Sequence, residues 1–335
     1  VVDNQSINQL SRSIIGHLKL AEKSLFRTIV RQWLASAYLA RAKLRRAEGQ
    51  VAKAVRSCES ALRLDSSNPD IHLHYALNLM TLQRDDGSIA ALNQVLRLRP
   101  FDPTALHLLQ ALHQQPSQKA PAGYVERLFN RFAATFDHRM NGVVNYRVPS
   151  LLAQRIGSIA RQHSVFDSAL DLGCGTGLSG DALRPYIRHL TGVDLSRKML
   201  DKASHKSIYD VLMCDEIIHF LNRCKTTFDL ITAADVFIYV GDLTSVFRLV
   251  QQRLDPAGIF AFSTERVRFA AYRLKKSGRF AHSSNYIYHL AEKNGFIVLS
   301  RDTIKLRLEH HQWVKGDLFI LGGTSFMENK TYPSP

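Results

Sequence analysis

The sequence predicts two domains, an all-α domain of helical repeats followed by an α/β domain built on a parallel sheet. Residues 35–120 are almost purely helical in pattern and contain a repeat with a period of about 34 residues. The stretch "QQPSQKAPAG" has the proline, glycine and polar composition of a linker. After it, short apolar runs alternate with amphipathic stretches, as in a sheet covered by helices on both faces. We therefore expect a helical domain at 1–113, a linker at 114–123 and an α/β domain at 124–335.

The composition is that of a globular protein, because 45% of the 335 residues are hydrophobic and 22% are charged. The sequence has no leader pattern and no uncharged apolar run of about 18 residues, so we expect a cytoplasmic protein without a membrane span. The chain begins without methionine, so its native start is either trimmed or upstream. Four scattered cysteines without zinc-ligand spacing predict reduced thiols and no metal site.

The chain is strongly basic, with 44 Lys and Arg against 29 Asp and Glu and a net charge of +15. This excess favours acidic partners such as nucleic acid or anionic membrane surfaces. Residues 1–120 carry 16 basic and 9 acidic side chains, so the excess is spread over both domains. RNA-recognition signatures are missing, and we do not expect nucleic acid as a partner.

The helical repeat is visible when the chain is aligned with itself so that residue 54 lies on residue 88. "AVRSCESALRLDSS" (54–67) then lies over "SIAALNQVLRLRPF" (88–101), with small and apolar residues in matching positions. This offset is the period of tetratricopeptide (TPR) helix pairs, so we expect repeats at 35–68 and 69–102 and a capping helix near "PTALHLLQALHQQ". Such a stack offers a groove for a protein partner, or it is a structural arm; both alternatives stay open.

The sequence predicts seven strands in the α/β domain. The expected strands are "SALDL", "LTGVDL", "YDVLMC", "FDLITAAD", "GIFAFST", "GFIVLS" and "DLFILGG". We expect helices at 196–204, at 241–254 with Asp242 as the N-cap, and at 283–295, ended by Gly295.

The turn after the first strand, "LDLGCGTGLSG", is rich in glycine, which lets backbone amides approach a ligand closely. Its spacing fits a dinucleotide fingerprint, because Gly175, Gly177 and Gly180 form G-x-G-x-x-G and Asp194 follows at about the expected distance along the chain. Asp171 argues against a pyrophosphate, since its carboxylate would repel that group and attract a cationic one by about 1 to 4 kcal/mol. The pattern favours a nucleoside that carries an amino acid.

Three motifs together resemble class I S-adenosylmethionine-dependent methyltransferases, from about residue 124 to the end. The motifs are "LDLGCGTG", "GVDLSRKMLDKA" and "FDLITAADVFIYV". The resemblance implies a Rossmann-like, seven-stranded methyltransferase sheet with helices on both faces and S-adenosylmethionine as the cofactor. More narrowly, "YVERLFNRFAATFDHRM", "SGRFAHSSNYIYHLAEKNGF" and "LRLEHHQWVKGDLFIL" are similar to a bacterial group of methyltransferases fused behind TPR repeats.

The resemblance also implies a cofactor site at the tips of the first three strands. Its members are Asp171, Gly173, Gly175, Gly177, Asp194, Leu195 and Asp215. Asp171 would lie near the methionine amino group, Asp194 would bind the ribose hydroxyls, and Asp215 would bind the adenine amine. Asp194 and Asp215 have an alternative role, since aspartate at these positions also caps the following helices.

The sequence contains two candidates for a general base, Tyr239 after the fourth strand and His282 in a polar loop before a helix. For His282 a structural role is the alternative. The apolar stripe of residues 124–140 predicts either a lid over the cofactor or ordinary core packing. The basic residues of the segment 266–279 suit an acidic substrate or form a solvated face.

We therefore expect an S-adenosylmethionine-dependent methyltransferase that acts on a small acceptor molecule, with a repeat arm for partner binding or support. The first alternative is a protein methyltransferase whose repeats capture the polypeptide substrate. The second alternative is a non-catalytic binding module in which the methyltransferase fold is a scaffold.

Overall fold

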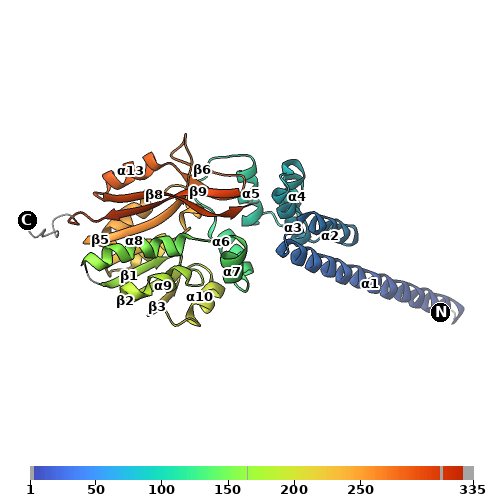
Figure 1. Cartoon of the computed structure of the whole chain (residues 1–335). Coiled ribbons are helices and arrows are strands. Elements are labelled where there is room, and N and C mark those ends of the chain that lie inside the picture. Colours follow the sequence, from blue (N-terminus) through green and yellow to red (C-terminus); the bar gives the residue numbers. More distant parts are fainter. Residues whose placement is uncertain (1–3, 164, 310–311, 327–335) are drawn as a thin grey trace, which may run out of the picture. The chain divides into compact units, whose positions relative to one another are not determined.

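The computed structural model describes residues 4–163, 165–309 and 312–326. The chain divides into two compact units, Val1–Leu109 and Gln110–Pro335, and the division lies within one helix, α5 (Pro103–Leu112). Figure 1 shows the helices of the first unit and the central sheet of the second. Among the described residues, none of the helices combines the length and the apolar character that crossing a bilayer requires.

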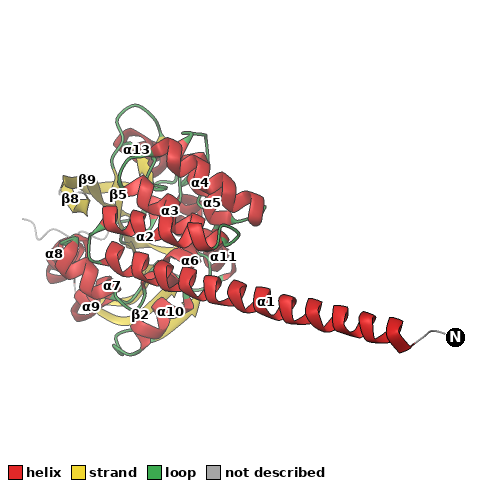
Figure 2. Ribbon diagram, turned by 90° about the vertical axis from the view of Figure 1, so that its right-hand side faces the viewer, coloured by secondary structure: helices red, strands yellow, loops and turns green. Residues whose placement is uncertain are grey.

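The N-terminal unit consists of consecutive helices that pack on one another (Figure 2). The helices are α1 (Asn4–Ala47), α2 (Val51–Leu64), α3 (Pro69–Thr81), α4 (Asp85–Leu98) and the first part of α5. Helices α2 and α4 have equal lengths, and α4 begins as far after α2 as α5 begins after α3. This offset equals the one between the aligned sequence stretches. The predicted period and the capping helix are therefore confirmed.

The same local device begins both α3 and α5. Asn68 accepts a hydrogen bond from the Asp70 amide at 3.0 Å, and Asp102 accepts one from the Thr104 amide at 3.0 Å. A proline follows each capping residue, where its missing N–H costs nothing and its fixed φ suits the helix. The core of the unit joins Ala35 of α1 to Ala61 of α2 and Ile71 of α3.

The C-terminal unit is an α/β fold with a seven-stranded sheet in the order β3-β2-β1-β4-β5-β9-β8. The strands are β1 (Phe166–Leu172), β2 (Ile187–Asp194), β3 (Val211–Cys214), β4 (Phe228–Ala233), β5 (Leu254–Glu265), β8 (Ile297–Glu309) and β9 (Gln312–Gly322). The first five are parallel, and β9 runs antiparallel to both β5 and β8. The predicted fold class and the seven main strands are confirmed.

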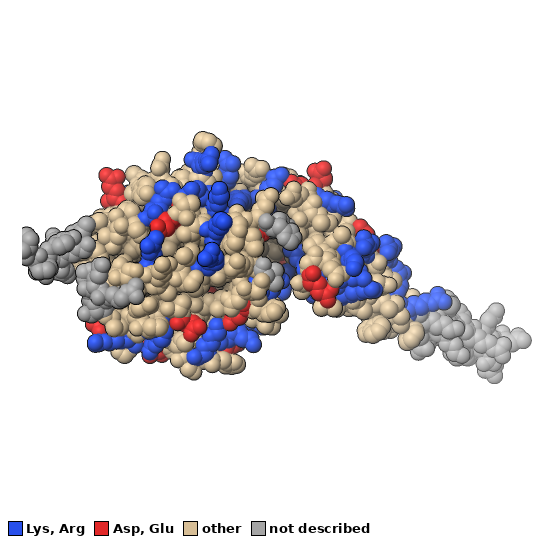
Figure 3. Space-filling model, in the orientation of Figure 1, with Lys and Arg blue, Asp and Glu red and all other residues tan. Residues whose placement is uncertain are grey.

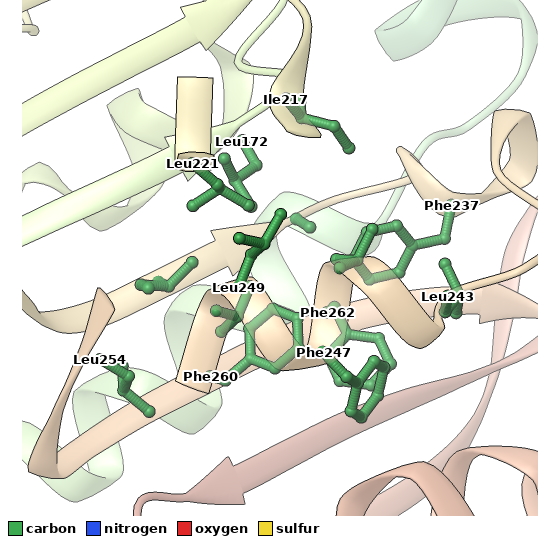
Figure 4. Close-up of a cluster of buried hydrophobic side chains, with 14 of the residues drawn as sticks. Leu172, Ile217, Leu221, Phe237, Leu243, Phe247, Leu249, Leu254, Phe260 and Phe262 are labelled. Atoms are coloured by element: carbon green, nitrogen blue, oxygen red, sulfur yellow. The ribbon is translucent and has the colours of Figure 1, made fainter. Parts of the chain in front are cut away.

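Helices cover both faces of this sheet (Figure 1). They are α8 (Val148–His163), α9 (Leu178–Leu183), α10 (Arg197–Ser204), α11 (Ile217–Arg223), α12 (Thr244–Arg253) and α13 (Ser284–Lys293). Along β5, Phe260 and Phe262 enter the core beneath α11, α12 and α13, whereas Ile259 and Ala261 enter the core beneath α8. Figure 4 shows the first of these cores. This alternation explains why the strands read as continuous apolar runs.

Several details differ from the sequence predictions. Strands β8 and β9 extend well beyond the expected runs, and a two-stranded ribbon of β6 (Tyr272–Leu274) and β7 (Phe280–His282) was not predicted. The N-cap of α12 is Leu243, not Asp242. Asp242 lies one residue earlier and still accepts a hydrogen bond from the Thr244 amide at 2.9 Å. Gly295 follows α13 with φ of +73°, as expected for a residue that ends a helix.

Part of the expected linker is fixed to the C-terminal unit. The Gln118 carbonyl accepts hydrogen bonds from the amides of Gly241 and Asp242 at 2.7 and 2.9 Å, and the Ala120 amide donates to the Tyr239 carbonyl at 2.9 Å. These bonds join the segment to the turn that follows β4, which contains the short helix η3 (Phe237–Tyr239).

Candidate active site

The candidate site begins where β1 leaves the sheet and the glycine-rich turn leads into α9. Gly173, Gly175 and Gly177 all have positive φ, and Gly177 in the left-handed region is the N-cap of α9. At Gly173, a Cβ atom would lie 2.5 Å from Val236. At Gly175, by contrast, a Cβ atom would meet nothing within 4 Å. The backbone at Gly175 therefore borders open space on a side that a side chain would fill.

Asp194 connects this turn to the two neighbouring strands. Its Oδ2 accepts a hydrogen bond from the Gly175 amide at 2.9 Å, and its Oδ1 accepts one from the Ser196 amide at 2.8 Å. Its carbonyl accepts a bond from the Asp215 amide at 3.1 Å. The carboxyl ends of β1, β2 and β3 are thus joined through one residue, and Asp194 is only 8% exposed. Burial raises the pKa of Asp194, while the three amides of Ser196, Gly175 and Leu195 oppose that shift.

Asp171 lies below the turn and is only 1% exposed. Both carboxylate oxygens already have partners, since the Tyr209 hydroxyl donates to one at 2.7 Å and the Thr232 hydroxyl donates to the other at 3.0 Å. Burial raises the pKa of Asp171 to about 6, although these two hydrogen bonds lower it. The expectation that Asp171 lies near the methionine amino group stays a prediction, but the buried carboxylate has almost no surface for direct contact with a ligand. The charge of Asp171 can act on a ligand only across the turn.

Asp215 is more accessible than the other two acids, with 20% of its side chain exposed. Its Oδ1 accepts a hydrogen bond from the Glu216 amide at 2.8 Å and interacts with His219 Nδ1 at 2.7 Å. Leu195, which follows Asp194 at the end of β2, is half-buried. Its carbonyl oxygen lies 3.7 Å from the thiol sulfur of Cys214, the residue before Asp215. The helix-capping alternative applies only partly, because Ser196 and Glu216 occupy the N-cap positions of α10 and α11.

The segment before β1 is tied to the same edge of the sheet. It consists of α6 (Ala122–Phe132), α7 (Phe136–His138) and η1 (Arg139–Val143). Asn130 accepts a hydrogen bond from the Ser196 hydroxyl at 2.7 Å. Asp137 accepts one from the Thr176 hydroxyl and pairs with Lys206 at 2.8 Å. This arrangement places a helical segment over the glycine turn and the end of β2. The two alternatives for this segment, a lid over the cofactor and ordinary core packing, stay predictions.

Tyr239 lies at the end of η3 and contacts that segment through its ring. Its ring centroid is 6.5 Å from that of Tyr124 and 5.4 Å from that of Phe129, and both pairs meet edge to face. Tyr239 is 9% exposed, and among the described residues its hydroxyl has no hydrogen-bond partner. The phenolic group of Tyr239 therefore lies at the point where η3, the segment α6 and the linker meet.

His282 is not in a polar loop, as the sequence suggested, but in strand β7, where it is fully buried. Its Nε2 lies 2.9 Å from the Val240 carbonyl and 3.0 Å from the Gly241 carbonyl, and its ring stacks on Tyr286. Burial lowers the pKa of His282 to about 4, although the two carbonyls raise it. The neutral His282 ring binds these two carbonyls and thereby holds the turn that carries Tyr239. These contacts favour the structural alternative for His282.

Sequence reasoning missed a buried ionic cluster next to the end of β4. Arg307 of β8 is 4% exposed and pairs with Asp235 at 3.1 Å and with Glu265 of β5. Asp235 has φ of +56° and interacts with Ser263 through both its amide and its carboxylate. Burial alone would raise the pKa of Glu265, but Arg307 and Lys275 outweigh it and hold this pKa below its usual value. The only sequence feature that pointed toward this cluster was the position of Asp235 directly after the apolar run of β4.

Three of the six basic residues in the segment 266–279 pair with described carboxylates of the same chain, and Arg268, Arg273 and Lys276 are exposed. Arg266 pairs with Asp317, Lys275 pairs with Glu265 at 2.8 Å, and Arg279 pairs with Glu309. These three cations are therefore balanced by carboxylates of the same chain. For the three exposed cations, the two alternatives from the sequence, an acidic substrate or a solvated face, stay predictions.

Two family models match the chain. Residues 118–315, more than half of the chain, match a methyltransferase domain, and residues 45–112 match a tetratricopeptide repeat. The first match covers every residue of the candidate site. The second covers α2, α3, α4 and α5.

Curated relatives match over part of their length. A ubiquinone biosynthesis O-methyltransferase of Coxiella burnetii is 30% identical over 128 residues, which are 37% of this chain and 52% of that protein. A malonyl-[acyl-carrier protein] O-methyltransferase of Bacillus anthracis is 30% identical over 145 residues, 42% of this chain and 52% of that protein. The chain thus spans about half the length of the curated relatives it matches.

Among solved structures, the N-methyltransferase NodS of Bradyrhizobium japonicum in complex with S-adenosyl-L-homocysteine is similar at 17% identity and a TM-score of 0.48. The alignment covers 59% of this chain and 98% of that one. On the match of more than half its residues, this chain belongs to the methyltransferase-domain family, with tetratricopeptide repeats in its N-terminal part.

Proposed function

We propose that the C-terminal unit transfers a methyl group from S-adenosylmethionine to an oxygen atom of a small acceptor molecule. The observation that carries this proposal is the connection of three strand ends through Asp194, which binds the Gly175 amide and the Asp215 amide. This edge adjoins β1 and β4, where the strand order reverses, and parallel sheets bind ligands at such a point.

The residues at this edge fit S-adenosylmethionine. Open space in front of Gly175 leaves room for a ligand against the backbone. Asp194 and Asp215 supply carboxylates for the ribose hydroxyls and the adenine amine, and Asp171 adds negative charge beneath the turn. This concentration of carboxylates suits a cationic ligand and disfavours a pyrophosphate. When bound, the cofactor supplies a methyl group on a positively charged sulfur atom.

The chain's own contribution to transfer is to align the acceptor and exclude water, which supplies several kcal/mol in such reactions. The segment α6 to η1 covers the glycine turn and would shield the reacting groups. We assign Tyr239 to the acceptor, since its hydroxyl is without a partner among the described residues. His282 supports Tyr239 indirectly through the Val240 and Gly241 carbonyls.

The relatives support oxygen as the acceptor atom. Both curated relatives described above are named as O-methyltransferases, one for ubiquinone biosynthesis and one for a malonyl group on a carrier protein. Their names differ in the acceptor, so they support the type of atom and not one molecule.

The test is transfer of label from radioactive S-adenosylmethionine into a cell lysate separated into protein, nucleic-acid and metabolite fractions. We expect label in the metabolite fraction with wild-type protein and a loss of labelling with Asp194→Asn. Tyr239→Phe should lower the rate of labelling while leaving the affinity for the cofactor unchanged, and Tyr288→Phe, at an exposed position of α13, is its control. Absence of label from every fraction would contradict the proposal.

The tetratricopeptide match favours a second candidate, methylation of a polypeptide that the repeats hold. Such stacks present a groove for extended or helical peptides. Label that appears mainly in the protein fraction, on proteins other than the enzyme itself, would favour this candidate over a small acceptor.

A further inference from the structure

Helix α1 exposes a row of large apolar side chains that its contacts within the repeats do not use. Leu25, Phe26, Ile29, Trp33 and Leu44 are 62%, 68%, 54%, 69% and 61% exposed. At 3.6 residues per turn, these five positions fall within about 100° of arc on one side of the helix. We call these five residues the α1 stripe.

The stripe lies on a different side of the helix from the contact with the repeats. Ala35, Leu39 and Ala42 are buried, and the first two pack against α2 and α3. Arg46 reaches the Leu77 carbonyl of α3 from the same side of the helix. A helix that is apolar on two sides can bury a second surface against a partner. Apolar residues that are exposed singly need no such explanation, but a continuous row of them indicates an interaction surface.

The polar positions of α1 are rich in basic residues. In the sequence of Asn4–Ala47, nine residues are Lys or Arg, and Glu22 is the one acid. By their positions around the helix, Arg41 borders the stripe on one side and Lys43 lies at its other edge. Figure 3 shows that Lys and Arg cover more of the visible surface of the helical unit than Asp and Glu do.

We propose that the α1 stripe is a docking surface for an anionic phospholipid bilayer, on which α1 lies parallel to the membrane plane. A helix with Trp, Phe and Leu on one face and Lys and Arg beside them has the composition of helices that bind at the interface. The basic residues attract anionic headgroups, and the apolar side chains enter the boundary with the acyl chains. The proposal requires no spanning segment and is independent of the methyl-transfer reaction.

The positive charge of α1 favours an anionic bilayer over a second copy of the chain as the partner of the α1 stripe. Two α1 helices packed stripe to stripe would bring two strongly positive helices together, and the like charges would repel each other. An anionic bilayer removes that cost and gains attraction from the same residues. The bilayer is therefore the occupant that suits both the apolar and the charged parts of the surface.

The experiment uses the full chain with vesicles of phosphatidylcholine alone or mixed with phosphatidylglycerol. The chain has two tryptophans, and Trp313→Phe leaves Trp33 as the single fluorophore of that type. We expect binding to the mixed vesicles in a sedimentation assay, a blue shift of Trp33 emission on binding, and weaker binding at high salt because ions screen the attraction.

The decisive variant is Phe26→Asp with Ile29→Asp, which places two charges in the stripe without touching the buried side of α1. It should bind mixed vesicles at least roughly tenfold more weakly, since it loses apolar contact and gains repulsion. Phe101→Asp is the matched control, because Phe101 is 89% exposed and lies outside α1. Circular dichroism should show the same helix content in all three proteins.

Three results would overturn the proposal. One is equal binding by the double variant and the control, and another is equal binding to vesicles without anionic lipid. The third is self-association of the free protein that the double variant abolishes while vesicle binding is absent, which would identify a second copy as the occupant. Each readout is independent of cofactor binding, so failure here would leave the proposed enzymatic function untouched.

Discussion

The Gly175 amide donates a hydrogen bond to the Asp194 carboxylate at 2.9 Å, and this bond fixes the glycine turn to the end of the neighbouring strand. The amide therefore points toward β2, while the α-carbon of Gly175 faces open space. The turn is held in place by the same residue that we assign to the ribose. The predictions below follow from this arrangement and from the charges around it.

Gly175→Ala should weaken binding of S-adenosylmethionine because the new methyl group fills space that the ligand needs. Gly49 provides a matched control, since it has a positive φ of +76° and also has nothing within 4 Å of a built Cβ atom. Each variant should lose about 1 kcal/mol of stability from backbone strain. Calorimetric titration should show weaker binding for Gly175→Ala and unchanged binding for Gly49→Ala. Equal affinities would contradict the placement of the cofactor.

Asp171 should make the stability of the fold depend on pH between about 4 and 6. Its pKa is about 6 in the folded protein against 3.8 for an unperturbed aspartate, so the folded state holds the proton more tightly than the unfolded state does. The free energy of unfolding should therefore fall as pH rises through this range, by about 1 to 3 kcal/mol relative to Asp171→Asn.

Chemical denaturation at several pH values measures this difference. Tyr209→Phe removes a hydrogen bond that lowers the pKa of Asp171, so its pH-dependent range should extend to higher pH. If the free energies of unfolding of wild type and Asp171→Asn changed with pH in the same way, Asp171 would not be the buried, proton-binding carboxyl described here.

Arg307→Met should destabilise the protein by about 3 to 5 kcal/mol, because it removes the cation that pairs with Asp235 and leaves the buried Glu265 with Lys275 as its paired cation. Arg188→Met is the control, since Arg188 pairs with Asp167 at the surface, where such a pair contributes less than about 1 kcal/mol. Thermal denaturation compares the two. The difference in stability between Arg307→Met and wild type should narrow in acid, as the Glu265 carboxylate, whose pKa Arg307 lowers, becomes protonated. Similar melting temperatures for both variants would contradict the structural importance of the cluster.

Much of the fold could be predicted from the sequence because the relevant signals are local or periodic. A shift by one repeat places α2 over α4, since both helices need small and apolar residues at the same intervals. The approach of Asp194 to the glycine turn was also predictable, because parallel strands end at one edge of the sheet. The assignment of these residues to the cofactor remains a prediction that the titrations test.

The features that the sequence did not reveal depend on contacts between distant segments. Arg307 of β8 meets Glu265 of β5 because both strands pair with β9, which brings two distant parts of the sequence into one sheet. No local pattern in the sequence indicates that pairing. His282 reads as part of a polar loop because its neighbours are serines, yet pairing with Tyr272 places it in a buried strand. Likewise, the burial of Asp171 depends on Tyr209, which lies 38 residues later in the chain.

The central claim is that Asp194 holds S-adenosylmethionine, and titration calorimetry of the full chain with this cofactor tests it most directly. Wild type should bind S-adenosylmethionine and not NAD, and Asp194→Asn should bind roughly 10- to 100-fold more weakly, as expected when a charged hydrogen-bond partner is lost. Asp201→Asn, on the exposed surface of α10, should bind like wild type. Equal affinity of Asp194→Asn and wild type, or a preference for NAD, would contradict the account.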